Sequence, residues 1–120
     1  MPAKRRIDTA AGRAALDAWR AGGEADRTTR ATAVRYTLEE LAARAPGHTL
    51  EVRVPPFGVT QCLAGPRHTR GTPPNVIETD AETWLALVTG RLSWTDARAT
   101  ARVSASGERA DLSEWLPLPI

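Results

Sequence analysis

A short polar segment, residues 65–74, contains the side chains with the clearest capacity for chemistry. Its sequence is GPRHTRGTPP, in which Arg67, His68 and Arg70 stand between glycine and proline residues. Because it has no apolar residue able to anchor it to a core, we expect a loop. Two guanidinium groups and an imidazole on a glycine-flanked turn can bind a phosphate or a carboxylate through paired N–H donors. The candidate anion-binding residues are Arg67, His68, Arg70 and Thr72.

The ordinary alternative for this segment is a solvated loop. Its arginines would then pair with carboxylates on neighbouring strands, for which Glu51 and Glu78 are candidates. Such surface ion pairs are common and contribute little to stability. A long polar loop is nevertheless a typical place for a binding site. Both interpretations stay open at the level of sequence.

Cys62 and His68 raise the question of catalysis, since a thiolate–imidazole pair is a nucleophile in principle. A lone cysteine in a strand, however, is usually a small buried hydrophobic side chain, and no third residue is evident to orient the imidazole. We therefore expect no enzyme and no cofactor. One cysteine and two well-separated histidines, His48 and His68, also cannot supply the about four ligands of a structural zinc site, so no metal is expected.

Length and composition indicate one folded domain. The chain has 120 residues, of which 42% are hydrophobic and 25% charged. No apolar run approaches the about 20 residues of a transmembrane helix, so stable membrane insertion is not expected. The N-terminus lacks the apolar core of a secretory signal, and we expect a cytoplasmic protein. A net charge of +2 and strands without aromatic residues argue against nucleic-acid binding.

Residues 75–92 hold the clearest structural pattern. Residues 75–78 predict a strand, and Thr79 with Glu82 forms a Thr-x-x-Glu capping box that predicts a helix start. An apolar stripe follows at helical spacing: Ala81, Trp84, Leu85 and Val88. Gly90 then predicts the end of the helix at about Thr89.

The remaining elements follow from the same periodicities. Helices are expected over residues 9–21, where a mostly alanine face docks loosely through Leu16 and Trp19, and over residues 29–45. Strands are expected over residues 49–54, 59–64 and 100–106, with a short helix opening at Ser93 and a last helical turn or two from Asp111. In the second strand either Val59, Gln61 and Leu63 or Cys62 and Ala64 face inward. The fold class is α+β: a mostly antiparallel sheet of four or five strands packed against helices.

One pattern resembles a known family. The spacing Asp80-x-x-x-Trp84-x-x-Leu87-x-x-Gly90-Arg91-Leu92, followed by a strand ending in Ser106-Gly107, resembles the second half of sterol carrier protein 2-like domains, and more narrowly their small bacterial branch. The resemblance covers roughly Arg30 to the C-terminus. We accordingly expect an N-terminal tail and helix extension in residues 1–27 and a sterol carrier-like domain in residues 28–120.

The resemblance implies a tunnel between helices and sheet for a fatty or sterol-like ligand. Its candidate lining residues are Leu50, Val52, Val54, Trp84, Leu87, Val88, Trp115 and Leu116. The alternative is an ordinary core, because each buried Leu or Val stabilises the fold by roughly 1.5–3 kcal/mol without any ligand. The last helix is short and ends in prolines, so the lid of such a tunnel is expected to be reduced, and a shallow groove or a closed core stays open.

The expected function is non-enzymatic binding or carriage of a small apolar or amphipathic molecule. An acidic head group would suit the arginine-rich loop if that loop stands at the mouth of a groove. The alternative is an accessory or protein-interaction module without a ligand, because the chain also resembles the C-terminal module of mycothiol-dependent isomerases. A homodimer or a partner protein is left open.

Overall fold

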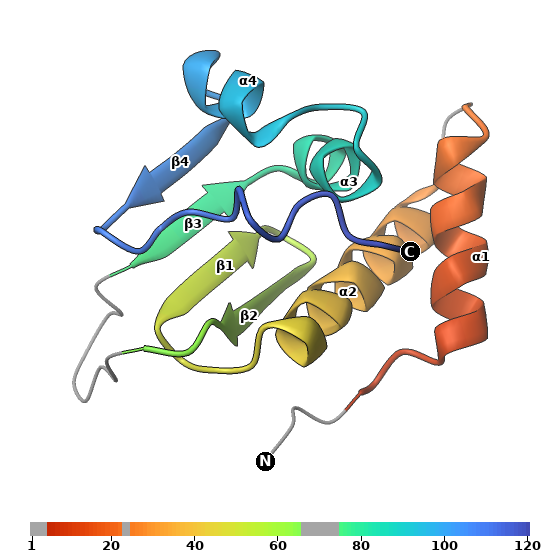
Figure 1. Ribbon diagram of the computed structural model, residues 1–120. Coiled ribbons are helices and arrows are strands. Elements are labelled where there is room, and N and C mark those ends of the chain that lie inside the picture. The colour runs from red at the N-terminus through yellow and green to blue at the C-terminus, as the bar shows by residue number, and fades with distance from the viewer. Residues whose placement is uncertain (1–4, 23–24, 66–74) are drawn as a thin grey trace.

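A four-stranded sheet with helices packed against it forms the centre of the computed structural model, which describes residues 5–22, 25–65 and 75–120. Figure 1 shows the longer helices beside the sheet and the shorter ones near the end of its strands at which β3 finishes and β4 begins. The elements in chain order are α1 (Thr9–Arg20), α2 (Arg27–Arg44), β1 (Leu50–Val54), β2 (Gly58–Cys62), β3 (Val76–Thr79), α3 (Ala81–Thr89), α4 (Trp94–Ala99) and β4 (Val103–Ser106). The predicted α+β class is confirmed.

The strand order is β2-β1-β3-β4. β1 pairs antiparallel with β2, β3 pairs antiparallel with β4, and the central β1–β3 pair is parallel. The sheet is thus mixed, with antiparallel pairing in the majority. β2 and β4 form its two edges.

The inner face of the sheet is set by the alternation in β1. Leu50, Val52 and Val54 are all fully buried, while Glu51 and Arg53 point to the other face. Pairing of Leu50 with Cys62 places the cysteine on the inner face, where it is fully buried. The question that the sequence left open for the second strand is thereby settled, and Val59 faces outward.

The cap of α3 differs from the prediction. Asp80, rather than Thr79, is the N-cap: its carboxylate accepts hydrogen bonds from the Thr83 backbone N–H (2.8 Å) and the Thr83 hydroxyl (2.9 Å). Thr79 is the last residue of β3, and its hydroxyl donates instead to the Arg102 carbonyl at 2.8 Å. The predicted stop is confirmed, since Gly90 has a left-handed φ of 82°.

α1 packs closely on α2 rather than loosely. Leu16 and Trp19 are buried as expected, and Trp19 Nε1 donates to Glu82 of α3 at 2.8 Å. The close approach occurs at Gly12, which lies against the fully buried ring of Tyr36: a Cβ built on Gly12 would stand 2.3 Å from Tyr36 Cγ. A missing side chain therefore permits this helix contact.

We expect Gly12→Ala to lower the free energy of unfolding by about 1–2 kcal/mol. Alanine favours the helix by roughly 0.5–1 kcal/mol, but overpacking a buried ring costs about 1–3 kcal/mol. Urea denaturation measures the difference. Ala11→Ser, at an exposed position of the same helix, is the control and should change stability by less than about 0.5 kcal/mol. A stabilised Gly12→Ala variant would contradict the close packing.

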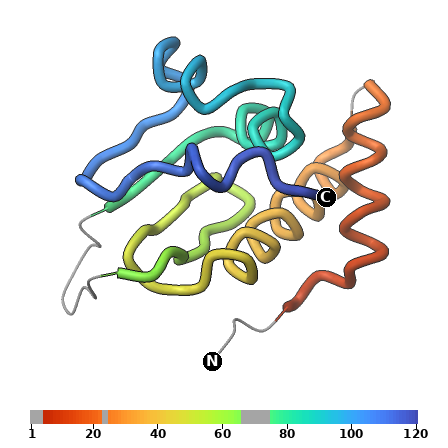
Figure 2. Tube along the Cα trace, in the orientation of Figure 1, coloured from red at the N-terminus to blue at the C-terminus, as the bar shows by residue number. Residues whose placement is uncertain are grey.

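The C-terminal segment, residues 107–120, crosses the sheet and ends beside α1 and α2 (Figures 1 and 2). The predicted helix from Asp111 is reduced to one turn, in which the Leu116 N–H donates to the Leu112 carbonyl at 3.1 Å. Pro117 and Pro119 prevent its continuation. Leu112 and Leu118 are buried in the main core, so this segment covers the inner face of the sheet in place of a lid helix.

Candidate binding grooves beside strand β2

The eight residues predicted to line a ligand tunnel belong to the core. Six of them are at most 1% exposed: Leu50, Val52, Val54, Trp84, Leu87 and Val88. Trp115 and Leu116 are half-buried and pack against the same cluster. None of the eight lines either of the two grooves described below.

Trp84 is central to that cluster. It is fully buried, and its indole Nε1 donates to the Thr37 hydroxyl of α2 at 2.9 Å. The Thr37 hydroxyl lies within 2.8 Å of the Ala33 carbonyl oxygen, its acceptor one turn earlier. A buried indole N–H needs such a partner, and α2 supplies it.

A groove of about 430 Å³, named here the edge groove, opens between α2 and the edge strand β2. Arg35, Leu38, Glu39 and Ala42 of α2 line one wall; their spacing of three and four residues puts them on one helix face. The facing wall is formed by residues 57–60, and Arg6 and Ile7 close one side. The full lining is Arg6, Ile7, Arg35, Leu38, Glu39, Ala42, Phe57, Gly58, Val59 and Thr60.

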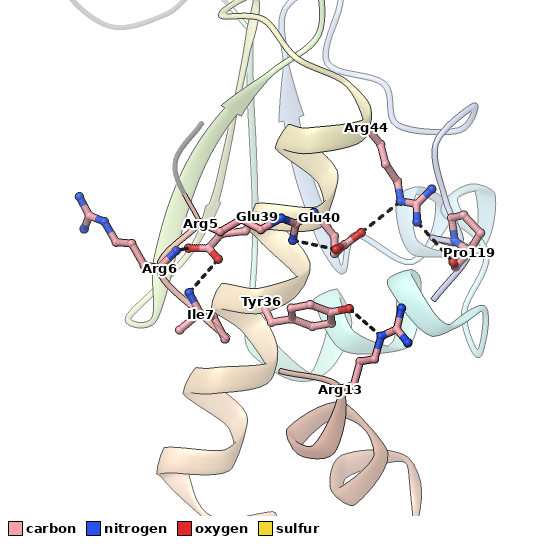
Figure 3. Close-up of polar contacts among 9 residues, drawn as sticks. All are labelled: Arg5, Arg6, Ile7, Arg13, Tyr36, Glu39, Glu40, Arg44 and Pro119. Atoms are coloured by element: carbon pink, nitrogen blue, oxygen red, sulfur yellow. Dashed lines mark hydrogen bonds and ion pairs between the residues drawn. The ribbon is translucent and has the colours of Figure 1, made fainter. Parts of the chain in front are cut away.

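The N-terminal segment, residues 5–7, is held at this groove by two carboxylates of α2 (Figure 3). Glu39 accepts the backbone N–H of Arg6 (2.9 Å) through one oxygen and that of Ile7 (3.0 Å) through the other. Arg5 forms an ion pair with Glu40 at 2.8 Å. A segment far from α2 in sequence thus completes the groove wall.

The charge at the edge groove is positive. Arg35 Nε donates to the Phe57 carbonyl at 2.8 Å, which holds this guanidinium at the rim, and Arg6 is also exposed there. Both oxygens of Glu39 are already engaged by backbone N–H groups. The groove therefore combines an apolar floor with two cationic groups that can meet an anion.

A second groove of about 440 Å³, named here the outer-face groove, lies on the opposite side of β2. Glu51, Arg53 and Glu78 supply its charges, and Arg53 Nε pairs with Glu51. Its remaining lining residues are Pro55, Pro56, Phe57, Gly58 and Val59. The two grooves share residues 57–59, so they flank the same short stretch of chain.

The predicted anion-binding residues Arg67, His68, Arg70 and Thr72 lie outside the described residues, and their role stays a prediction. Glu51, one of the suggested ion-pair partners of the loop arginines, pairs with Arg53 within the described residues, and its pairing with the loop stays a prediction. Within the described ranges, no group of three or more His, Cys, Asp or Glu side chains is arranged to hold a metal ion.

Cys62 is fully buried, and burial raises the pKa of its thiol from 9.0 to about 12. The thiol is therefore protonated at neutral pH.

At pH 7.5 we expect iodoacetamide to label Cys62 of the folded protein about 1000-fold more slowly than in the urea-unfolded chain, because only the thiolate reacts. The rate should rise about tenfold per pH unit as the pH increases towards that pKa. Equal rates in the folded and unfolded chain would contradict this burial; mass spectrometry follows the reaction.

The sequence did not reveal the edge groove. A signal was present in the helical spacing of Arg35, Leu38, Glu39 and Ala42, which mixes charged and apolar residues on one face. Nothing in the sequence, however, indicates that residues 5–7 return to Glu39. The groove depends on that tertiary contact.

Comparison with known families gives one match. A family described as bacterial SCP orthologs, where SCP stands for sterol carrier protein, matches residues 26–118. The chain belongs to this family. The sterol carrier-like resemblance inferred from residues 80–92 is thereby confirmed. No curated protein matches the chain.

The matched range begins just before α2, so α1 and the N-terminal segment stand outside the bacterial SCP ortholog match although they pack on α2. The edge groove is thus lined partly by α2 and β2, which lie inside the matched range, and partly by Arg6 and Ile7, which lie outside it. In the described part of the chain, none of the helices has the length and apolar character needed to cross a membrane.

Proposed function

We propose that this protein binds or carries a small apolar or amphipathic molecule, of the lipid, fatty acyl or sterol-like class, without catalysing a reaction. Membership of the bacterial SCP ortholog family supports a lipid-binding or carrier role in general. The observation that carries the proposal is the edge groove: about 430 Å³ with an apolar floor and arginines at its rim. Small-molecule sites typically have about 300–1,000 Å³ and a few well-placed polar groups.

The edge groove suits an acyl chain with an acidic head better than the core does. The groove offers apolar contact to an acyl chain through Ile7, Leu38 and Ala42. At its rim, Arg6 and Arg35 are placed to bind the carboxylate of that molecule. The core residues predicted from the resemblance are packed against one another and against the C-terminal segment. Their contact with a ligand would require that segment to move, and it remains a prediction.

Ala42→Glu tests the site. The probe is 11-(dansylamino)undecanoic acid, a fluorescent fatty acid, titrated into gently delipidated protein. A carboxylate at residue 42 of the groove wall repels the probe's head and puts a charge against its chain, so we expect at least tenfold weaker binding. Ala43→Glu carries the same substitution at the exposed neighbouring position and should bind like the wild type.

Arg35→Gln tests the head group. We expect about three- to fivefold weaker binding of the fatty acid, a modest effect because the guanidinium is exposed. Binding of the corresponding dansyl alcohol should not change. Arg102→Gln, an exposed arginine outside both grooves, is the control. An equal loss of affinity for the fatty acid and for the alcohol would argue against binding of the probe's carboxylate by Arg35.

The second candidate function is an accessory or protein-interaction module without a ligand. The filled inner face of the sheet favours it, because the family's implied tunnel position is occupied by the protein's own side chains. Absence of probe binding to the delipidated wild type would select this alternative. In either case we expect a cytoplasmic protein, which the single cysteine supports.

A further inference from the structure

The free edge of β2 presents unpaired backbone groups. The Glu51 N–H donates to the Asn75 carbonyl, so Glu51 directs its backbone groups towards β3. Its neighbours Leu50 and Val52 then bond to β2 through Cys62 and Thr60. By alternation, Val59 and Gln61 direct their N–H and C=O groups away from the sheet. Within the described ranges, no backbone partner meets them there.

β2 itself carries none of the side chains that usually protect an edge strand against pairing. β2 reads GVTQC, with no charged residue and no proline. Val59 is 59% exposed and is the one large apolar side chain that is exposed to this degree among the described residues. An open, uncharged edge with an exposed apolar residue can accept a further strand.

The two grooves lie where the side chains of such a strand would point. Successive side chains of a strand alternate between the faces of a sheet. One set would enter the edge groove on the inner side, and the other would lie on the outer face beside Val59, over the outer-face groove. A strand running antiparallel to β2 would place one inward residue beside Thr60, at the apolar wall. The next inward residue would lie beside Gly58, where a Cβ built on the glycine would stand 3.1 Å from Leu38 Cδ1 and 3.7 Å from Arg35 Cγ.

We propose that β2 binds an extended segment of a partner protein by strand addition, and that this segment carries an apolar residue followed two positions later by an acidic one. Arg6 and Arg35, against the single carboxylate of Glu39, leave the groove lining with a net positive charge that complements the acidic residue. The same charges disfavour a second copy of this chain, since edge-to-edge pairing would bring two such cationic groups together.

The test uses the full chain and a fluorescein-labelled peptide, Thr-Val-Thr-Leu-Thr-Glu-Thr-Val-Thr, measured by fluorescence anisotropy. We expect saturable binding with a micromolar Kd, and at least fivefold weaker binding of the peptide with lysine in place of glutamate. Arg35→Gln should reduce this preference. Absence of binding at millimolar peptide, or indifference to the glutamate, overturns the proposal.

Gln61→Pro supplies the decisive variant. Proline removes the outward N–H while leaving the ladder to β1 intact, because the Gln61 N–H does not serve that ladder. We expect at least tenfold weaker peptide binding. Gln61→Thr keeps the N–H, loses the same contact to His48 (2.7 Å), and should bind within twofold of the wild type. Equal binding by the two variants overturns the proposal.

Two further outcomes separate this proposal from others. If sedimentation velocity shows a wild-type dimer and a monomeric Gln61→Pro variant, the edge of β2 pairs with a second copy of this chain. That result would overturn the proposal that it binds a segment of a partner protein. Gln61 lines neither groove, so Gln61→Pro should still bind the dansyl fatty acid. Failure of strand addition is thus distinguishable from failure of the proposed lipid site.

Discussion

Replacing Trp84 by alanine is expected to lower the free energy of unfolding by about 3–5 kcal/mol. Trp84 is fully buried where α3 meets α2 and the sheet, so truncation leaves a large cavity that these elements cannot fill by small shifts. Its hydrogen bond to the Thr37 hydroxyl is lost as well. Urea denaturation followed by far-ultraviolet circular dichroism measures the change.

One variant separates packing from hydrogen bonding, and a second tests whether the position of the tryptophan matters. Trp84→Phe keeps an aromatic ring but lacks the N–H donor, and we expect a loss of about 1–2 kcal/mol. Trp94→Ala, at a half-buried tryptophan in the first turn of α4, should cost less than Trp84→Ala. If Trp84→Ala were as stable as Trp94→Ala, the buried Trp84 side chain would contribute no more to the core than a half-buried tryptophan does.

The helices could be predicted because their signals are local. Spacing of apolar residues placed α2 and α3 correctly, Gly90 marked the end of α3, and Ser93 was recognised as a cap. Ser93 accepts the Asp96 N–H at 3.0 Å, as the sequence indicated. These interactions join residues within one helical turn, so a short window of sequence contains all the information they need.

The cap of α3 shows where local information ends. Thr79 and Asp80 are both good N-cap residues, and each has a suitable polar residue three positions later. A tertiary contact decides between them: β3 extends through Thr79, whose hydroxyl donates to the carbonyl of Arg102, the residue before β4. The prediction erred by one residue because that partner is distant in sequence.

The candidate site was harder to predict than the fold. Periodicity identified the inward residues of β1 and α3, and it cannot indicate whether the space between them is hollow. The edge groove in turn requires Arg6 and Ile7 to bond to Glu39, which lies 33 and 32 positions away from them in the sequence. No pattern in the sequence predicts a contact between residues so far apart. Resemblance to a family gave the expected function class, whereas the edge groove, the site proposed for that function, is visible only in the structure.

Asn75 is a second residue whose role depends on partners that are distant in sequence. The sequence indicated only the first residue of a strand, whereas the structure buries this side chain between three segments. Its Nδ2 donates to the Thr49 carbonyl at 3.0 Å, and its Oδ1 accepts the Arg109 N–H at 2.9 Å. It thereby ties the start of β3 to the approach of β1 and to the C-terminal segment.

We expect Asn75→Ala to lower the free energy of unfolding by about 2–4 kcal/mol, because a buried and a partly buried hydrogen bond are lost together and the Arg109 N–H loses this acceptor. Thermal and urea unfolding measure the loss. Gln61→Ala, which removes an exposed amide, is the matched control and should change stability by less than about 0.5 kcal/mol. Equal losses in the two variants would contradict a structural role for the buried amide.

Asn75→Asp then distinguishes the two bonds. Aspartate retains an acceptor for the Arg109 N–H, but its carboxylate cannot donate to the Thr49 carbonyl, so the loss at pH 7 should persist. The protonated acid can donate. A buried carboxylate that faces the Thr49 carbonyl oxygen with no proton between them has a raised pKa, and the folded state therefore favours the protonated form. The deficit relative to wild type should accordingly shrink as the pH falls through the folded-state pKa. A deficit that grows at low pH would mean that the bond to Arg109, and hence the position of the C-terminal segment over the sheet, is the dominant contribution.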